Sequence, residues 1–204
     1  DPANGRWFPG VRWHQTTLQA FLVGALCKAW EAAGWIRLGD RAHFLEHPED
    51  LAPVFLAGRV LSAFMGTLSV GLAWAAARRL YGARAGWVAG LLLSTLFLHL
   101  FHSRLSLLNV PLAFWWMLEA WFAVRVLQGG GVRAWAGAGM ALGLACATKI
   151  TVLASLPGLV LLAVLAPERS WKGPAAALLA FSAGLGLGCP EFLLRPATAW
   201  DLLR

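Results

Sequence analysis

Charge is the scarcest property of this chain. Only 13% of its 204 residues are Asp, Glu, Lys or Arg, whereas 59% are hydrophobic, and the mean hydropathy is +0.63. A soluble domain of this length is usually about half apolar and about a quarter charged. The apolar excess gathers in windows of roughly 20 residues, the length of helix that crosses a bilayer. The composition therefore argues against an ordinary soluble domain and predicts an all-α, polytopic transmembrane helical bundle.

Signatures of several soluble enzyme classes are missing as well. The sequence has no Walker loop, GxSxG elbow, HExxH pair or twinned cysteine motif, which argues against a soluble-type ATPase, a serine hydrolase and a zincin. Its three cysteines lack metal or disulfide spacing and are interpreted as small packing residues. The net charge of +7 does not indicate nucleic-acid binding, because the basic residues are not interleaved with exposed aromatics in a polar groove.

Hydrophobic patterning divides the chain into three parts. Residues 1–53 form an outer-face loop with an interfacial helix at 15–35; residues 36–53 are polar, and their carboxylates are interpreted as a solvated face. Residues 54–190 form the transmembrane bundle, and 191–204 begin another outer-face loop. Within the bundle we expect about six spans, at 54–77, 85–101, 105–124, 134–148, 150–166 and 173–190. The chain starts at Asp1 without a signal-like segment and stops soon after a span, so we expect it to be cut at both ends.

Basic residues between the spans predict the orientation. Arg and Lys gather with Gly around 78–84, 125–133 and 167–172, and the positive-inside rule places such short loops in the cytoplasm. The segments 1–53, 102–106, 148–149 and 190–204 then share the opposite face. Seven of the twelve tryptophans lie near span ends, where an amphipathic indole suits the interface. Runs of glycine four residues apart, as at Gly139 and Gly143, predict close helix packing.

Ionisable residues at membrane depth are the candidates for function, because they are costly there. Lys149 interrupts an apolar stretch of about 30 residues and could bind an anionic head group or snorkel from a helix end. Arg104 opens a span and could hold a phosphate or snorkel. His99 and His102 can share a helix face, and structural hydrogen bonding is favoured over zinc because no third ligand is near. Asn109 could cap a helix or bind a ligand.

Four short segments resemble a known family. They are similar, in order and sidedness, to elements of GT-C glycosyltransferases: Ala57–Val70 running on to Ala77–Gly82, His102-Ser-Arg104 with Asn109-Val-Pro111, Gly143–Lys149, and Cys189-Pro190-Glu-Phe. The closest likeness is to the dolichyl-phosphate-mannose protein mannosyltransferases, glycosyltransferase family 39, and their bacterial relatives. The resemblance covers nearly the whole chain and implies a GT-C-like bundle.

The resemblance also implies a reaction. Such enzymes move a sugar from a polyprenyl-phosphate donor to a lipid, glycan or protein hydroxyl on the non-cytoplasmic face, here of a bacterial plasma membrane. Lys149 and Arg104 would contact the lipid-linked phosphate, His102 and Asn109 would line the same outer cavity, and His14 would lie near the donor or acceptor entrance.

Two features depart from the family pattern. The acidic Asp-Glu motif of the first outer loop is absent, so we expect the catalytic carboxylate upstream of Asp1. Relatives often have Asp where this chain has Asn109, which leaves a divalent metal possible as cofactor but not required.

Two other function classes stay open from the sequence alone. An anion transporter or channel could use Lys149 and Arg104 along its path, and a broken helix at mid-membrane with inverted internal symmetry would favour it. A non-catalytic membrane assembly subunit would use the polar residues only to bridge helices.

Overall fold

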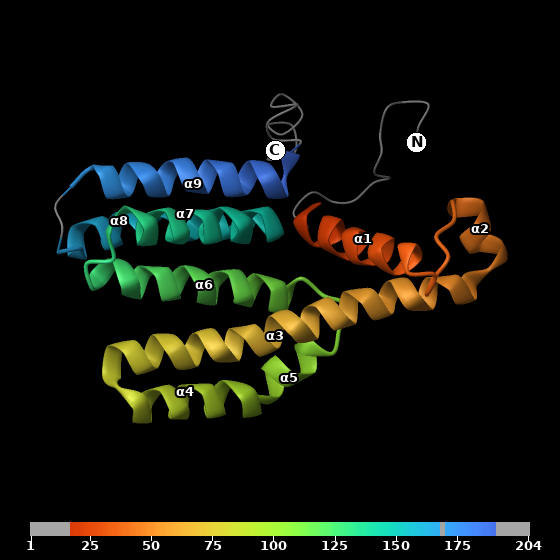
Figure 1. The fold of residues 1–204 in the computed structure, drawn as a ribbon, viewed down its shortest axis with the longest axis horizontal. Helices are drawn as coiled ribbons and strands as arrows, with labels where there is room; N and C mark the ends of the chain where they lie inside the picture. The colour runs from red at the N-terminus through yellow and green to blue at the C-terminus, as the bar shows by residue number, and fades with distance from the viewer. Residues whose placement is uncertain (1–16, 168–169, 191–204) are drawn as a thin grey trace.

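The computed structural model describes residues 17–167 and 170–190 (Figure 1). Within those ranges the regular secondary structure consists of α-helices and 3-10 helices, and no strand is present. The N-terminal part holds α1 (Thr17–Ala32), α2 (Arg41–Glu46) and the 3-10 turn η2 (Pro48–Asp50). The remaining elements are α3 (Leu51–Tyr81), α4 (Ala83–Thr95), α5 (Phe97–Ser103), α6 (Asn109–Leu127), α7 (Gly131–Thr148), η3 (Ile150–Ser155), α8 (Leu156–Leu165) and α9 (Lys172–Gly188). The predicted all-α class is confirmed.

The long helices lie side by side in the order α4, α3, α6, α7 and α9, with α8 beside α7 (Figure 1). The basic connections α3–α4, α6–α7 and α8–α9 lie at one end of this layer (Figure 1). The α5–α6 connection, the α7–η3 junction, the start of α1 and the end of α9 lie at the other. This is the division into two ends that the basic residues predicted. We name them the basic end and the α5–α6 end.

Small residues let the helices of the layer approach one another. Ala138 and Ala145 of α7 are completely buried. A Cβ at Gly139 or Gly143 would overlap backbone atoms of α9, at Ala177 and Phe181 respectively. The glycine spacing is therefore a packing device, as the sequence indicated.

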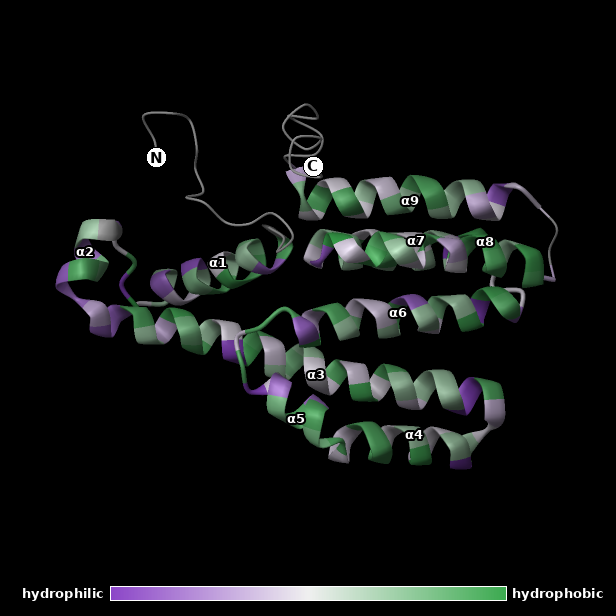
Figure 2. Ribbon diagram, turned by 180° about the vertical axis from the view of Figure 1, so that it is seen from behind, coloured by the Kyte–Doolittle hydropathy of each residue, from purple (hydrophilic) through white to green (hydrophobic). Residues whose placement is uncertain are grey.

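Large apolar side chains cover the outside of the bundle. Leu91, Leu92, Val160, Val164 and Leu179 are all more than half exposed, and Figure 2 shows hydrophobic residues along the length of the helices. Exposed apolar surface of this extent is typical of helices that face lipid. Together with the apolar helix lengths, it describes an integral membrane protein.

Fewer than six helices of the described chain are, by length and composition, able to cross a membrane on their own. Among the described residues, two helical segments are long and apolar enough to cross a membrane, Pro48–Tyr81 with 34 residues and Asn109–Leu127 with 19. The α4–α5 pair would make a third, although it bends by 59°. Six spans are not confirmed, because α9 has only 17 residues and the apolar stretch Ile150–Leu165 is shorter still.

The bend between α4 and α5 corrects the continuous span expected at 85–101. The hydroxyls of Ser94 and Thr95 donate to the carbonyl oxygen of Leu91, at 2.9 and 2.8 Å. Leu96 then adopts an extended backbone, and α5 starts at Phe97. Such local hydroxyl–carbonyl bonds compete with the helical ladder and often accompany bends. The next helix begins at Asn109 and not at 105.

Candidate functional site

Three elements meet at the α5–α6 end near Lys149. Leu18 of α1, Ala147 of α7 and Cys189, which follows α9, form a buried apolar cluster. The cluster fixes the end of α7 against the start of α1, and Trp115 of α6 packs against it. Lys149 comes two residues after Ala147, so it is held at a place where helices from distant parts of the sequence converge.

Lys149 breaks the helix as the sequence predicted. Its backbone is extended, with φ −156° and ψ 114°, between the end of α7 and the 3-10 helix η3. Thr148 before it is fully buried, and its hydroxyl donates to the carbonyl oxygen of Leu144 at 2.9 Å. Lys149 is half-buried, and its ammonium makes no hydrogen bond or ion pair with any residue that the structure describes. A cation without an anionic partner in the described chain, at such a junction, is suited to an anionic ligand.

Close packing against α3 positions the α5–α6 connection. A Cβ at Gly58 would overlap the Ser106 hydroxyl, and one at Gly66 would crowd Ser103. The His99 ring also contacts α3, where its Nε2 lies 3.2 Å from the carbonyl oxygen of Gly66. His99 is therefore committed to a structural hydrogen bond, the interpretation that the sequence favoured. No group of three or more potential metal ligands occurs among the described residues.

His102 and Asn109 approach each other across this connection. The Asn109 Nδ2 and His102 Nδ1 atoms lie 3.4 Å apart. Asn109 is the first residue of α6, and its side chain does not cap that helix. Arg104 ends α5 through its backbone N–H, while its exposed guanidinium has no partner among residues 17–167 and 170–190.

The structure thus joins two of the predicted site residues directly and leaves the others apart. Lys149 follows α7, whereas Arg104 and the His102–Asn109 pair lie where α5 ends and α6 begins. These helix ends lie at the same end of the layer (Figure 1), but within the described chain no hydrogen bond connects Lys149 or Arg104 to the pair. His14 lies outside the described residues. The prediction that these residues share one cavity stays a prediction.

Two buried polar groups nearby were missed by the sequence reasoning. Gln19 is only 8% exposed, and neither the oxygen nor the nitrogen of its amide has a hydrogen-bond partner among the residues that the structure describes. The indole N–H of Trp115 is also buried and has no acceptor in the described chain. Gln19 follows Leu18, and Trp115 packs on the Leu18 cluster, so both groups lie by the end of α7. Buried polar atoms in native proteins are nearly always paired, which makes these two candidates for contact with a bound polar ligand.

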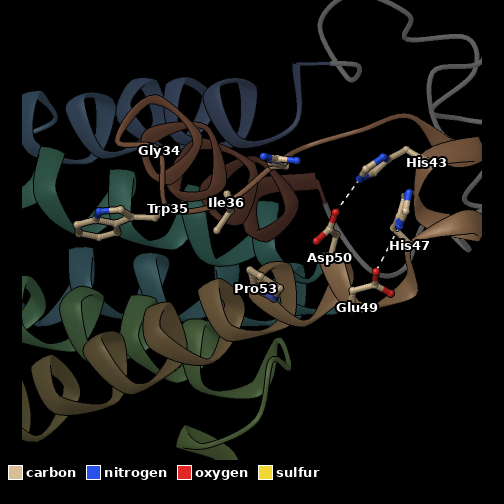
Figure 3. Close-up of a pocket in the computed structure, with 9 residues that line it drawn as sticks. Gly34, Trp35, Ile36, His43, His47, Glu49, Asp50 and Pro53 are labelled. Carbon is tan, nitrogen blue, oxygen red and sulfur yellow. Dashed lines mark hydrogen bonds and ion pairs between the residues drawn. The ribbon is translucent and has the colours of Figure 1, made fainter.

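A hollow of about 410 Å³ lies in the 36–53 region, away from these residues (Figure 3). It is lined by Gly34, Trp35, Ile36, Arg37, His43, His47, Glu49, Asp50 and Pro53. Two of the carboxylates here make specific hydrogen bonds, although the sequence indicated only a solvated face. Asp40 caps α2, and η2 folds back so that Asp50 Oδ2 lies 2.8 Å from His43 Nε2. In the sequence, Asp40 could have been identified as the capping residue of a short helix that ends before Pro48.

A further residue that the sequence reasoning missed, Glu119, lies inside α6. The Glu119 carboxyl makes no hydrogen bond or ion pair with any described residue. Trp115 and Val126 are four residues before it and seven after it, on the same helix face, and pack against two apolar clusters. An acidic residue in the middle of a predicted span was itself a signal for attention.

Comparison with known proteins gives one match. The family model described as dolichyl-phosphate-mannose-protein mannosyltransferase matches residues 53–190, a range that contains Lys149, Arg104, His102 and Asn109. No curated protein and no solved structure matches the chain.

Proposed function

Because the chain belongs to the dolichyl-phosphate-mannose-protein mannosyltransferase family, we propose that it transfers a sugar from a polyprenyl-phosphate donor to a lipid, glycan or protein hydroxyl. Membership of this family makes it a membrane glycosyltransferase of the GT-C type. The family match carries the proposal. We place the reaction at the α5–α6 end, on the non-cytoplasmic side of the membrane.

Lys149 would stabilise the phosphate of the donor. When the glycosidic bond breaks, negative charge develops on the polyprenyl phosphate that leaves, and a fixed cation stabilises that charge most effectively where water is scarce. Lys149 is half-buried and has no anionic partner among the described residues. It can therefore supply its full charge to a ligand.

Arg104, His102 and Asn109 would complete the polar wall around the donor. The free guanidinium of Arg104 can bind phosphate with two parallel N–H donors. The His102–Asn109 contact of 3.4 Å orients two groups that can hydrogen-bond to sugar hydroxyls. His14, in the N-terminal region, would lie near the entrance for donor or acceptor.

Gln19 and Trp115 would bind the sugar itself. A sugar hydroxyl both donates and accepts, so it matches an amide and an indole N–H that lack partners among the described residues. Leu18, the neighbour of Gln19, and Trp115 both pack with Ala147, which lies two residues before Lys149. The phosphate and the sugar of one donor would then be bound by neighbouring groups.

Transfer assays on the Lys149→Ala variant test this proposal. The full-length protein is incubated in membranes with a panel of radiolabelled polyprenyl-phosphate sugars, and labelled acceptor is measured. We expect Lys149→Ala to abolish transfer at unchanged expression. The control is Lys28→Ala, which removes an exposed lysine that is paired with Glu31 and should transfer normally. Undiminished turnover in Lys149→Ala would remove Lys149 from the site.

A further inference from the structure

Cations form a row across the basic end of the helical layer. Each of α3, α4, α6, α7 and α9 contributes at least one near the point where it ends or begins there. The row consists of Arg78, Arg79, Arg84, Arg125, Arg133 and Lys172. All are exposed except Arg125, which is half-buried. Figure 2 shows hydrophilic segments at this end of α3, α4 and α9. These cations thus come together at one end of the layer from helices that are far apart in the sequence.

The cations of this row have no acidic partners among the described residues. The ion pairs in the described chain all lie in residues 28–50, as do all of the described acids except Glu119, which lies within α6. The sequence adds Glu168 and Arg169 in the α8–α9 connection, which leaves the local net charge unchanged. The surface therefore has a strong positive field that no described part of the chain neutralises.

The side chain of Arg79, in this row, is held by two neighbouring side chains. Its Nε donates to Gln128 Oε1, and its Cζ lies 5.5 Å from the centre of the Trp121 ring. An arginine has five N–H donors, so the other four, on the two terminal nitrogens, are without an acceptor in the described chain. A guanidinium with restricted freedom and unused donors is a preorganised site for a phosphate group.

Exposed aromatic side chains mark this surface as the membrane interface. Tyr81, Trp87 and Trp171 are 78%, 64% and 77% exposed, and each lies within a few residues of a cation in the row. Aromatic residues of this kind sit at the level of lipid head groups. The phosphates closest to Arg79 and its neighbours are therefore those of membrane lipids.

We propose that the basic end binds the phosphodiester head groups of anionic phospholipids, with Arg79 as the central contact and Arg84, Arg133 and Lys172 around it. This site is distinct from the donor site at the other end of the layer, and it does not depend on the transferase function. Binding would fix the depth and tilt of the bundle in that leaflet. Polybasic segments gain about 1 kcal/mol per Lys or Arg near an anionic surface.

Lipid retention measured by native mass spectrometry tests the site. The detergent-purified full-length protein is incubated with equal amounts of phosphatidylglycerol and phosphatidylcholine. The wild type should retain phosphatidylglycerol preferentially. The Arg84→Gln, Arg133→Gln, Lys172→Gln triple variant removes three exposed cations that make no side-chain hydrogen bond among the described residues. It should lose about fivefold of that preference for each cation removed.

A second triple variant controls for total charge. Lys28→Gln, Arg37→Gln, Arg59→Gln removes three exposed cations on the other side of the molecule and should retain the preference. Equal losses in both triple variants would show an unspecific charge effect and would overturn the site. Displacement of phosphatidylglycerol by inorganic phosphate, beyond that by chloride at equal ionic strength, would assign a small-anion site and would overturn the lipid assignment.

Arg79→Gln separates lipid binding from structural support. If this variant does not fold, Arg79→Lys keeps the charge but cannot reproduce the planar fork. We expect either variant, when folded, to bind less phosphatidylglycerol than the wild type. Wild-type lipid preference in a folded Arg79 variant would refute its place at the centre.

Discussion

Arg79 and Gln128 hold each other across two turns that are 49 residues apart in the sequence. Arg79 Nε donates to the Gln128 side-chain oxygen, and Gln128 Nε2 donates to the backbone oxygen of Arg79 at 3.1 Å. The reciprocal pair joins the end of α3 to the end of α6. It therefore closes the seam between these helices at the basic end.

Removing the Gln128 side chain should loosen that seam. Both partners are exposed, so we expect Gln128→Ala to lower the free energy of unfolding by about 1 kcal/mol or less, the range of one or two solvent-accessible hydrogen bonds. Thermal unfolding in detergent measures this effect. Gln128→Glu keeps an acceptor for Arg79 and should recover most of the loss. If Gln128→Ala unfolds at the wild-type temperature, the pair adds nothing to stability.

Two glycines in helix interiors should respond oppositely to alanine. A Cβ at Gly139 would overlap the Ala177 backbone of α9, whereas nothing lies within 4 Å of a Cβ at Gly71 of α3. We expect Gly139→Ala to destabilise the bundle by several kcal/mol, as overpacking against backbone does. Gly71→Ala should stabilise it by up to about 1 kcal/mol through helix propensity. Paired unfolding curves give both values, and equal signs would contradict the packing described here.

Glu119 should be replaceable without loss of stability. Its carboxyl has no partner among the described residues, and a polar group left unpaired in apolar surroundings costs about 1–3 kcal/mol. Glu119→Leu should therefore unfold at a higher temperature than the wild type. Glu119→Gln, which keeps the shape without the charge, should lie between them. A lower unfolding temperature for both variants would show that Glu119 has a stabilising partner in the full-length protein.

Helix positions were predictable from the sequence where apolar length and polar breaks coincide. Lys149 predicted the end of α7 at Thr148, and the Arg-Gly cluster predicted the turn at Gly82. The bend after Thr95 was not predictable, because it depends on which backbone carbonyl accepts a hydrogen bond from the hydroxyls of Ser94 and Thr95. The expected number of spans is not confirmed, because an apolar stretch does not reveal how much of it becomes one straight helix.

The candidate site was predictable only for residues that stand out chemically in an apolar stretch. Lys149 and Arg104 were visible for this reason. Gln19 was not, because a neutral amide in a helix of mixed polarity gives no signal until its burial is known. The contact between His43 and Asp50 was not predictable either, because it depends on the turn at η2 that brings Asp50 back to α2.

Gln19→Leu should separate stability from sugar binding. Leucine fills a similar volume and removes both unpartnered amide atoms, so the free energy of unfolding should rise or stay unchanged. If the amide contacts the sugar, loss of one or two hydrogen bonds should lower kcat/KM by about tenfold. Binding of polyprenyl phosphate without a sugar should not change, because Lys149 and Arg104 remain.

Gln19→Glu, which keeps an oxygen acceptor, should retain more transfer than Gln19→Leu. An unchanged kcat/KM together with a lower unfolding temperature would instead mean that the amide supports the fold. A residue with a purely structural role changes the free energy of unfolding without changing the binding of the sugar.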